Sequence, residues 1–262
     1  MAGTVDKTLA ATGAQADGTS VSPTLVPGFS ATGFNIGAGN SFTFQSSVAT
    51  AFGQSYGYRA VQAGANTVTA YMDLAAAETG VFAWRDYFRF QNTPISTVIR
   101  RLFPDATHAD NLGSLTHTST NRLQFLEDSS GGGTPLNVTS TGTVMSAATA
   151  YCGLGKIDLT ANTFGYILYP LGNPTQLFSI SGTLAADTAA ATGIQSLRLP
   201  IGTASSGIGN YDLGADTAVG HGDYLPRTDI SNTAPIANAG ADQTNIEPRT
   251  TVTISGTGST DS

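Results

Sequence analysis

The chain has 262 residues, of which only 11% are charged, and its formal net charge at pH 7 is −7. This balance argues against a nucleic-acid partner, because such proteins carry basic patches and the chain has no basic cluster beyond Arg100-Arg101. The 31 glycines, the many threonines and the scarcity of glutamate argue against a helical protein, since glycine and β-branched residues form helices poorly.

Cys152 is the only cysteine, which excludes an internal disulfide and a cysteine-based zinc site. No run reaches the roughly 20 apolar residues that a transmembrane helix needs. The N-terminal sequence MAGTVDKTLA lacks the basic and apolar regions of a signal peptide. We therefore expect a chain that is made in the cytoplasm and has no membrane span.

Residues 1–40 are rich in Gly, Ala, Thr and Ser and show little periodicity. We predict an extended N-terminal arm, with a flexible terminus as the alternative. A solvated tail does not need apolar side chains, so an assembly contact with another subunit is expected from five of them: Leu25, Val26, Phe29, Phe34 and Ile36.

From residue 41 to about residue 230, short β-type runs alternate with turn signals, which predicts one all-β domain. The predicted strands are 42–48, 57–63, 66–73, 81–91, 95–103, 121–127, 148–158, 163–170, 175–181 and 194–201. A hairpin turn is expected around Asn162, because Asn tolerates turn conformations.

The segment Val81–Phe90 (VFAWRDYFRF) has the clearest strand pattern. Alternation places Phe82, Trp84, Phe88 and Phe90 on one apolar face, which must belong to a core. Asp86 falls on this same face, so it needs a buried partner or a strand bulge.

The last part of the chain, 231–262, contains the sequence APIANAGADQTNIEPRTTVTISGTGSTDS from Ala234 onward. This resembles the opening of an immunoglobulin-like module of the PKD/REJ type. A sandwich of that kind needs about 80–100 residues, so we expect a linker and the first strands of an incomplete module, in a natural protein that is longer.

The order of motifs in the central domain resembles the concanavalin A-like (laminin G-like) jelly roll, especially the version in actinobacteriophage tail proteins. The matching segments are GQSYGYRAV (Gly53–Val61), VFAWRDYFRF, NRLQFLEDSSGG (Asn121–Gly132) and AYCGLGKIDLTANTFGYILYP (Ala150–Pro170). The resemblance covers roughly residues 42–215 and implies a jelly-roll sandwich. The sequence departs from the family at Cys152, Gly153 and Gly155, where larger or charged residues are usual.

No catalytic motif stands out. Retaining glycosidases of this fold need two carboxylates about 5–5.5 Å apart on one strand face, and the adjacent Glu127-Asp128 point to opposite faces. We therefore predict that the chain is not an enzyme and has no cofactor. The set Asp212, Asp216 and Asp223 suits calcium in its ligand type, but a solvated loop is the simpler interpretation.

A sugar-binding face requires aromatic platforms and planar polar groups. Arg85, Tyr87 and Arg89, on the second face of the Val81–Phe90 strand, meet this requirement, and Tyr166 is expected to join them. The alternative is an ordinary sheet face that loops or a neighbouring subunit cover.

Taken with the resemblance, these features predict a structural protein of a bacteriophage virion, a minor tail protein on the particle surface rather than a head component. Its expected partners are other virion proteins, copies of itself and the cell-wall polysaccharide of the host. Two alternatives stay open: a phage capsid decoration protein, and the carbohydrate-binding module of a secreted bacterial adhesin.

Overall fold

The computed structural model describes residues 2–61, 68–92, 97–128, 135–142, 145–185, 193–199 and 210–230. The chain divides into two units, Met1–Asp229 and Ile230–Ser262. The predicted start of an immunoglobulin-like module at 231–262 lies outside the described residues.

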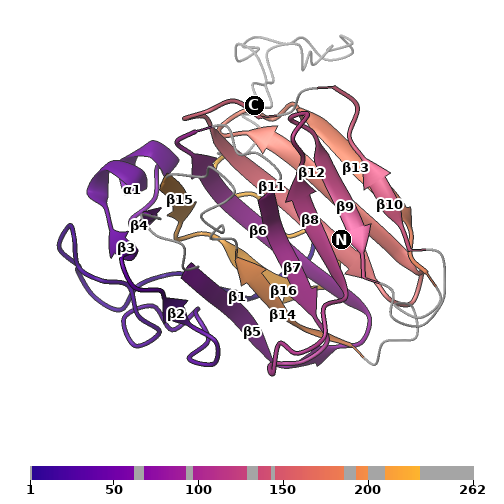
Figure 1. Cartoon of the computed structure of the whole chain (residues 1–262), viewed down its shortest axis with the longest axis horizontal. Helices are drawn as coiled ribbons and strands as arrows, with labels where there is room; N and C mark the ends of the chain where they lie inside the picture. Colours follow the sequence, from indigo (N-terminus) through magenta and orange to yellow (C-terminus); the bar gives the residue numbers. More distant parts are fainter. Residues whose placement is uncertain are drawn as a thin grey trace, which may run out of the picture. The chain divides into compact units, whose positions relative to one another are not determined.

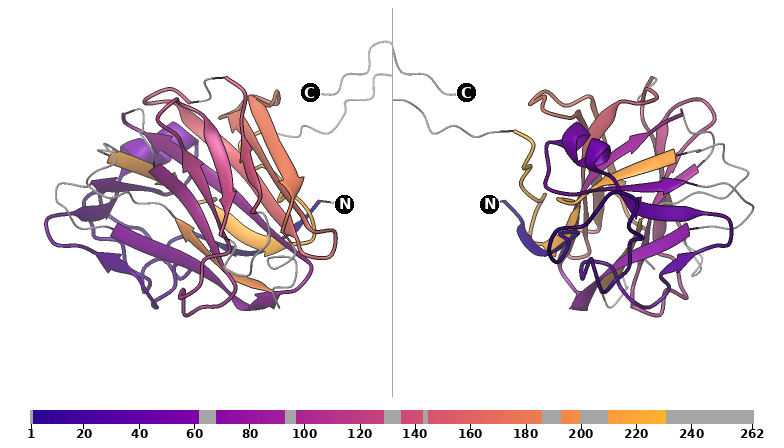
Figure 2. Two further views of the ribbon diagram at one scale, coloured as in Figure 1. Left: turned by 45° about the vertical axis from the view of Figure 1, so that its right-hand side comes forward. Right: turned by 90° about the vertical axis from the view of Figure 1, so that its left-hand side faces the viewer.

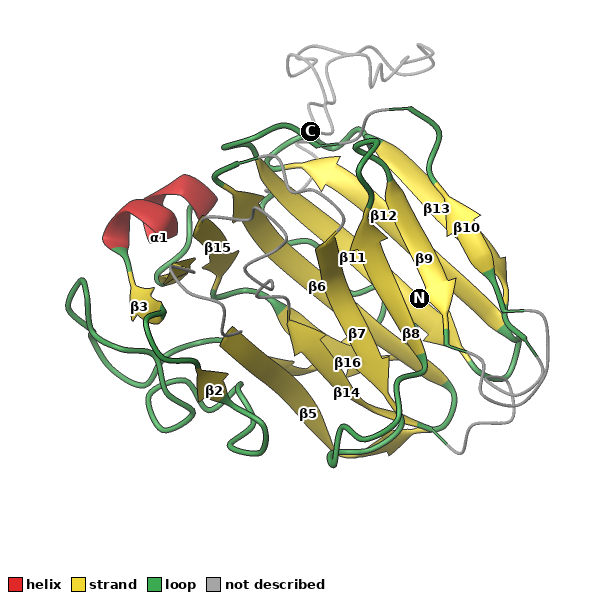
Figure 3. Ribbon diagram, in the orientation of Figure 1, coloured by secondary structure: helices red, strands yellow, loops and turns green. Residues whose placement is uncertain are grey.

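Two antiparallel sheets make up the first unit (Figures 1 and 3). Sheet 1 has the strand order β13 (Phe178–Thr183), β12 (Thr163–Pro170), β11 (Ala150–Asp158), β6 (Val81–Phe90), β15 (Asn210–Gly214), β4 (Gly57–Val61) and β3 (Ser41–Phe44). β16 (Ala218–His221) pairs with β6 next to β15, and β1 (Thr4–Thr8) pairs with β16. In the turned views of Figure 2, the indigo β1 lies beside the yellow β16.

Sheet 2 lies against sheet 1 and has the strand order β10 (Asn137–Thr139), β9 (Leu123–Glu127), β8 (Gly113–His117), β7 (Thr97–Phe103), β14 (Ile194–Leu199), β5 (Val68–Glu78) and β2 (Asn35–Ile36). The chain crosses between the sheets at each step from β4 to β7 and then runs through β8, β9 and β10 in sheet 2. The predicted all-β fold, a jelly-roll sandwich of two antiparallel sheets, is confirmed.

The core lies between the two sheets. On β6, Phe82, Trp84, Phe88 and Phe90 are buried in it, as the alternation predicts. Asp86 is also fully buried there, and Arg100 of β7 provides the expected partner, with Arg100 Nε 2.9 Å from Asp86 Oδ1.

Helix α1 (Ser46–Phe52) replaces the second half of the strand predicted at 42–48. Its Val48, Ala49 and Phe52 are buried, a helical spacing that the preceding β-type run conceals. Gly53 ends the helix with φ 65°, a left-handed conformation that glycine adopts without strain. Among the described residues, no helix has the length and apolar character needed to cross a membrane.

The N-terminal segment differs from the predicted extended arm. Val26 and Phe29 are buried in the core, and Leu25, Phe34 and Ile36 pack against it. Backbone bonds hold the segment down: Val21 N donates to Phe42 O (2.8 Å), and Ser30 N donates to Tyr71 O (2.8 Å). Residues 2–40 therefore belong to the sandwich domain, and a contact with another subunit would require Val26 and Phe29 to leave its core.

Candidate functional site

The chain itself covers the part of the outer face of sheet 1 that carries Arg85 and Tyr87. A segment from Asp223 to Asp229, here called the C-terminal clasp, lies over the face that Arg85 and Tyr87 occupy. Arg85 Nη1 donates to Pro226 O, and Tyr87 Oη accepts from Thr228 N at 2.8 Å and donates to Asp229 Oδ1 at 3.1 Å. Both side chains are buried, so they are not available to a ligand.

The other two predicted sugar-binding residues are also engaged. Arg89 shares the buried carboxylate of Asp212 with Arg59, at Nη2–Oδ2 and Nε–Oδ1 distances of 2.6 and 2.7 Å. Tyr166 lies in the core and donates to Asp86 Oδ2 at 3.1 Å. The predicted site of four residues is therefore corrected: the chain covers Arg85 and Tyr87, Arg89 is engaged by Asp212, and Tyr166 lies in the core.

The three aspartates considered for calcium have separate partners. Asp212 pairs with the two arginines above, and Asp223 Oδ1 lies 2.6 Å from Lys156 Nζ. Asp216 Oδ2 accepts from Thr228 Oγ1 at 2.7 Å. Within the described ranges, no group of three or more acidic, His or Cys side chains is arranged to hold a metal ion.

The outer face of sheet 2 carries a different set of polar side chains. Tyr71 on β5, Arg198 on β14 and Arg101 on β7 are direct neighbours in register. All three point away from the core because the residues that flank them in each strand point into it; these include Ala70, Met72, Leu197, Leu199 and Leu102. We call Tyr71, Arg198 and Arg101 the arginine row.

The two guanidinium groups of the arginine row are under-satisfied. Arg101 Nε and Arg198 Nε are both buried without a hydrogen-bond partner. Burial lowers the pKa of Arg198 from its ordinary value; Tyr71 acts in the opposite direction, and the positive charge of Arg101 adds to the lowering. In the described part of the chain neither arginine has an ion pair. Two positive charges therefore lie side by side with no acidic partner from the protein, an arrangement that favours the binding of an anion.

Aromatic rings border the arginine row at its β5 end. Tyr71 stacks on His108 with ring centroids 3.6 Å apart, and Phe103 packs edge-on against Tyr71 at 5.7 Å. His108 Nε2 lies 3.0 Å from Asp73 Oδ1, which fixes the imidazole. These contacts hold Tyr71 rigidly beside Arg198.

The same line continues across the sheet beyond Arg101. The register leads from Arg101 to Ser114 on β8, then to Leu126 on β9 and Asn137 on β10. Leu126 is an exposed large apolar residue, and Gln124 and Thr116 lie in the adjacent line. The line crosses six strands, which at about 4.8 Å spacing makes it roughly 24 Å long. Charged, polar and apolar side chains follow one another across it.

The sequence pointed to part of this site only. Arg100-Arg101 is visible as the single basic pair, and strand alternation requires one of its members to point outward. Arg198 gives no such signal, because one arginine between two leucines has no motif. Its importance follows from its register with Arg101, which depends on the pairing of β14 with β7.

No family model and no curated protein sequence matches this chain. Solved structures do resemble it in fold. A GH131 β-glucanase catalytic domain from Podospora anserina is 14% identical, with a TM-score of 0.43, over 70% of this chain and 79% of that one. An alginate lyase from Klebsiella pneumoniae is 11% identical, with a TM-score of 0.45, over 69% and 84%.

A third similar structure is the CBM2 module of the evolved Dit of Lactobacillus casei BL23 phage J-1. It is 8% identical, with a TM-score of 0.44, over 64% of this chain and 78% of that one. At these identities the likeness concerns the fold alone.

The prediction that the chain is not an enzyme is corrected, because structures that resemble it in fold include catalytic domains. The fold therefore does not exclude catalysis, and at these identities it assigns none. The criterion applied to the sequence, a pair of carboxylates, recognises glycoside hydrolysis only. A lyase does not need such a pair, so the absence of a carboxylate pair does not exclude catalysis.

Proposed function

We propose that this domain binds an acidic polysaccharide along the outer face of sheet 2, with Arg101 and Arg198 holding an anionic group of the polymer. The observation that carries this proposal is that two half-buried arginines, paired in register on the outer face of sheet 2, have no ion pair within the described residues. A carboxylate or sulfate offers several acceptor atoms in the planar arrangement that guanidinium groups recognise.

The surroundings of the arginine row suit a sugar polymer better than a small anion. Tyr71 is only 9% exposed and its ring is stacked on His108, so it holds the β5 end of the arginine row rigid and offers no platform to a sugar. The half-buried Thr116 and Gln124 and the exposed Asn137 supply hydroxyl and amide groups farther along the sheet. A polymer lying across the strands would contact these groups together.

The net charge of −7 repels a polyanion at long range, so affinity must come from short-range contacts with the two arginines. Screening at physiological salt limits the repulsion to about 8 Å. Binding is therefore expected to weaken with salt only modestly, unlike the binding of a polyanion to a basic patch.

The test is titration of the purified domain with polygalacturonate, alginate and heparin, with neutral dextran as the reference polymer. Wild-type protein should bind at least one acidic polymer and not dextran. Arg101→Gln and Arg198→Gln should each weaken binding about tenfold or more, because a charged hydrogen bond contributes about 1.5–3 kcal/mol.

Arg122→Gln is the matched control. Arg122 is exposed at the turn between β8 and β9, and its loss removes the same charge without touching the arginine row. If all three substitutions weakened binding equally, the affinity would depend on net charge alone and not on the arginine row. That result would contradict the proposal.

The same mixtures report on catalysis. Shortening of the polymer, followed by size-exclusion chromatography, would identify an enzyme, and ultraviolet absorbance from unsaturated chain ends would identify it as a lyase. Tyr71, the register neighbour of Arg198, and His108, which stacks on Tyr71, are the first side chains to substitute if products appear.

We also propose a setting for this activity, the surface of a bacteriophage particle, with the tail favoured over the head. The sequence resemblance to tail proteins supports it, and an acidic polysaccharide of the host cell wall would then be the polymer. Immunogold labelling of purified particles with an antibody against the sandwich domain tests it. Label on bacterial walls but not on particles would favour a secreted adhesin instead.

A further inference from the structure

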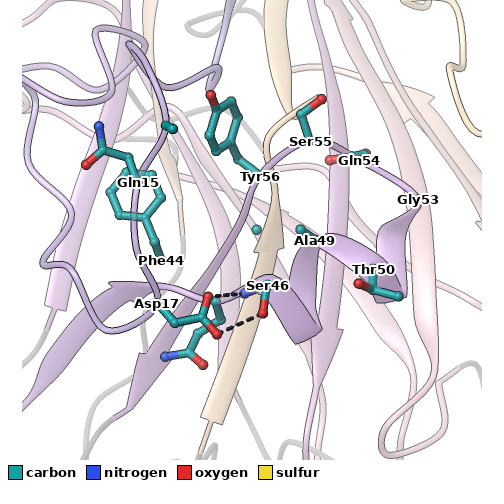
Figure 4. A pocket seen from close by; sticks show the side chains of 13 residues that line it. Gln15, Asp17, Phe44, Ser46, Ala49, Thr50, Gly53, Gln54, Ser55 and Tyr56 are labelled. Carbon is teal, nitrogen blue, oxygen red and sulfur yellow. Dashed lines mark hydrogen bonds between the residues drawn. The ribbon is translucent and has the colours of Figure 1, made fainter.

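A pocket of about 600 Å³ lies beside helix α1, on elements that are not part of sheet 2 (Figure 4). Its lining comes from three segments of the chain, Ala14–Asp17, Phe44–Thr50 and Gly53–Gly57. Its volume falls within the range of small-molecule sites, about 300–1,000 Å³. None of its lining residues belongs to the arginine row or to the C-terminal clasp.

Two aromatic rings form the apolar part of the pocket. Phe44 and Tyr56 are in edge contact with centroids 6.3 Å apart. Tyr56 Oη donates to Gly13 O at 2.9 Å, which ties the ring to the N-terminal segment. Both rings are thus fixed before any ligand arrives, which lowers the entropic cost of binding.

Polar groups of the pocket are fixed as well. Asp17 Oδ1 accepts from Ser46 N at 2.6 Å, and Asp17 Oδ2 accepts from Ser46 Oγ at 2.8 Å (Figure 4). Gln54 Oε1 accepts from Asp216 N at 3.0 Å, which settles the orientation of the Gln54 amide. Gln54 Nε2 is then a buried donor with no acceptor in the protein.

The charge of the pocket limits the class of ligand. Asp17 is its one charged residue, and the lining contains no Lys, Arg or His, so an anion is disfavoured. Exposed hydroxyl groups of Thr50 and Ser55 stand at its margin. Fixed rings, an unsatisfied amide donor and hydroxyls suit a neutral ligand with an apolar face and several hydroxyl groups.

We infer that this pocket is a second carbohydrate site, which binds a neutral mono- or disaccharide. The hydroxyl oxygens of such a sugar would accept from Gln54 Nε2, and one face of its ring would pack against Tyr56. This inference does not rest on the acidic-polysaccharide site, because the two sites share no residue.

The experiment is saturation-transfer NMR of the purified domain with five probes: methyl α-glucopyranoside, methyl β-galactopyranoside, N-acetylglucosamine, maltose and lactose. At least one probe should bind with a millimolar dissociation constant. Ser55→Trp and Thr50→Trp, which place a bulky ring at the margin from two exposed positions, should each abolish the signal. Ser119→Trp, at an exposed position in the turn between β8 and β9, should leave it unchanged.

Binding of none of the five probes, or binding that survives both tryptophan substitutions, would overturn the inference. Gln54→Leu adds a second measurement and should weaken binding about tenfold, since it removes the unsatisfied donor. The double variant Arg101→Gln/Arg198→Gln should still bind the neutral sugar. Failure of this site therefore stays distinct from failure of the acidic site.

Discussion

Asp86 of sheet 1 and Arg100 of sheet 2 form an ion pair that joins the two sheets inside the core. Both side chains are fully buried, and the pair is extended by hydrogen bonds from Tyr166 Oη to Asp86 Oδ2 and from Arg100 Nη1 to Tyr211 Oη. A buried charge is costly without its partner, so this pair fixes which residue of β6 faces which residue of β7.

Removing either member of the pair should therefore destabilise the fold strongly. We expect Arg100→Met to lower the free energy of unfolding by about 3–5 kcal/mol, because Asp86 is left buried and uncompensated. Chemical denaturation measures this change. The double variant Asp86→Asn/Arg100→Met should lose less than the sum of the two single variants.

Lys156→Met is the control for this comparison. It breaks the Lys156–Asp223 pair, whose side chains are 28% and 42% exposed, and pairs of that kind contribute about 0–1 kcal/mol. A loss for Arg100→Met as small as the loss for Lys156→Met would show that the buried pair does not hold the sheets together.

The C-terminal clasp should control access to Cys152. The thiol is fully buried in a small cluster with Tyr87, and burial raises its pKa to about 12. Asp229 anchors the clasp by accepting from Arg227 Nε (2.9 Å), Gly172 N (2.7 Å) and Tyr87 Oη (3.1 Å). We expect Asp229→Asn to speed labelling of Cys152 by 4,4′-dithiodipyridine several-fold, and Asp110→Asn, at an exposed position, to have no effect.

Acid should loosen the C-terminal clasp by protonating Asp229. Burial acts to raise the pKa of Asp229, but its bonds from Arg227 and Gly172 outweigh burial and hold that pKa below the ordinary 3.8. A carboxyl with a lowered pKa stabilises the folded state above its ordinary pKa, and this stabilisation is lost as the pH falls through the folded pKa. The clasp should therefore begin to loosen as the pH falls below about 4. The labelling rate of Cys152, divided at each pH by the rate for free cysteine because the thiolate fraction falls with pH, should then rise, whereas a flat normalised profile would count against this role of Asp229.

Local sequence patterns were sufficient to predict much of sheet 1. The alternation in Val81–Phe90 identified the core face and the need of Asp86 for a partner, and the strand predicted at 163–170 is β12. Asn162 has φ 55°, in agreement with the expected turn. These features depend on neighbours in sequence, which is why alternation and turn residues reveal them.

Features that depend on distant pairing were missed. β15 and β16 contain Asp and Gly and resemble a loop in sequence, yet they pair with β6, more than a hundred residues earlier. The clasp likewise covers Arg85 and Tyr87 from far along the chain. For this reason the sequence pattern predicts a ligand surface on the amphipathic face of β6 and gives no sign of the arginine row, which three separate strands bring together.

The glycines at which the sequence departs from the resembling family have a packing role. A side chain at Gly155 would collide with the ring of the fully buried Trp84, and one at Gly153 with Tyr166. We expect Gly155→Ala to cost about 1–3 kcal/mol of unfolding free energy through overpacking. Gly80→Ala, where the nearest atom is the flexible carboxylate of Glu78, should cost much less when both are compared by thermal denaturation.

Arg198 should lower the free energy of unfolding of the domain while contributing to the binding of the acidic polysaccharide. Its buried Nε has no acceptor and its charge lies beside that of Arg101, and an unsatisfied buried donor costs about 1–3 kcal/mol. We expect Arg198→Met, which keeps an apolar stem of similar length, to raise the free energy of unfolding by about 1 kcal/mol while affinity for the acidic polysaccharide falls. Arg122→Met should change neither quantity. A loss of stability in Arg198→Met would mean that the guanidinium is already satisfied in the folded protein, and the case for an anion between Arg101 and Arg198 would fail with it.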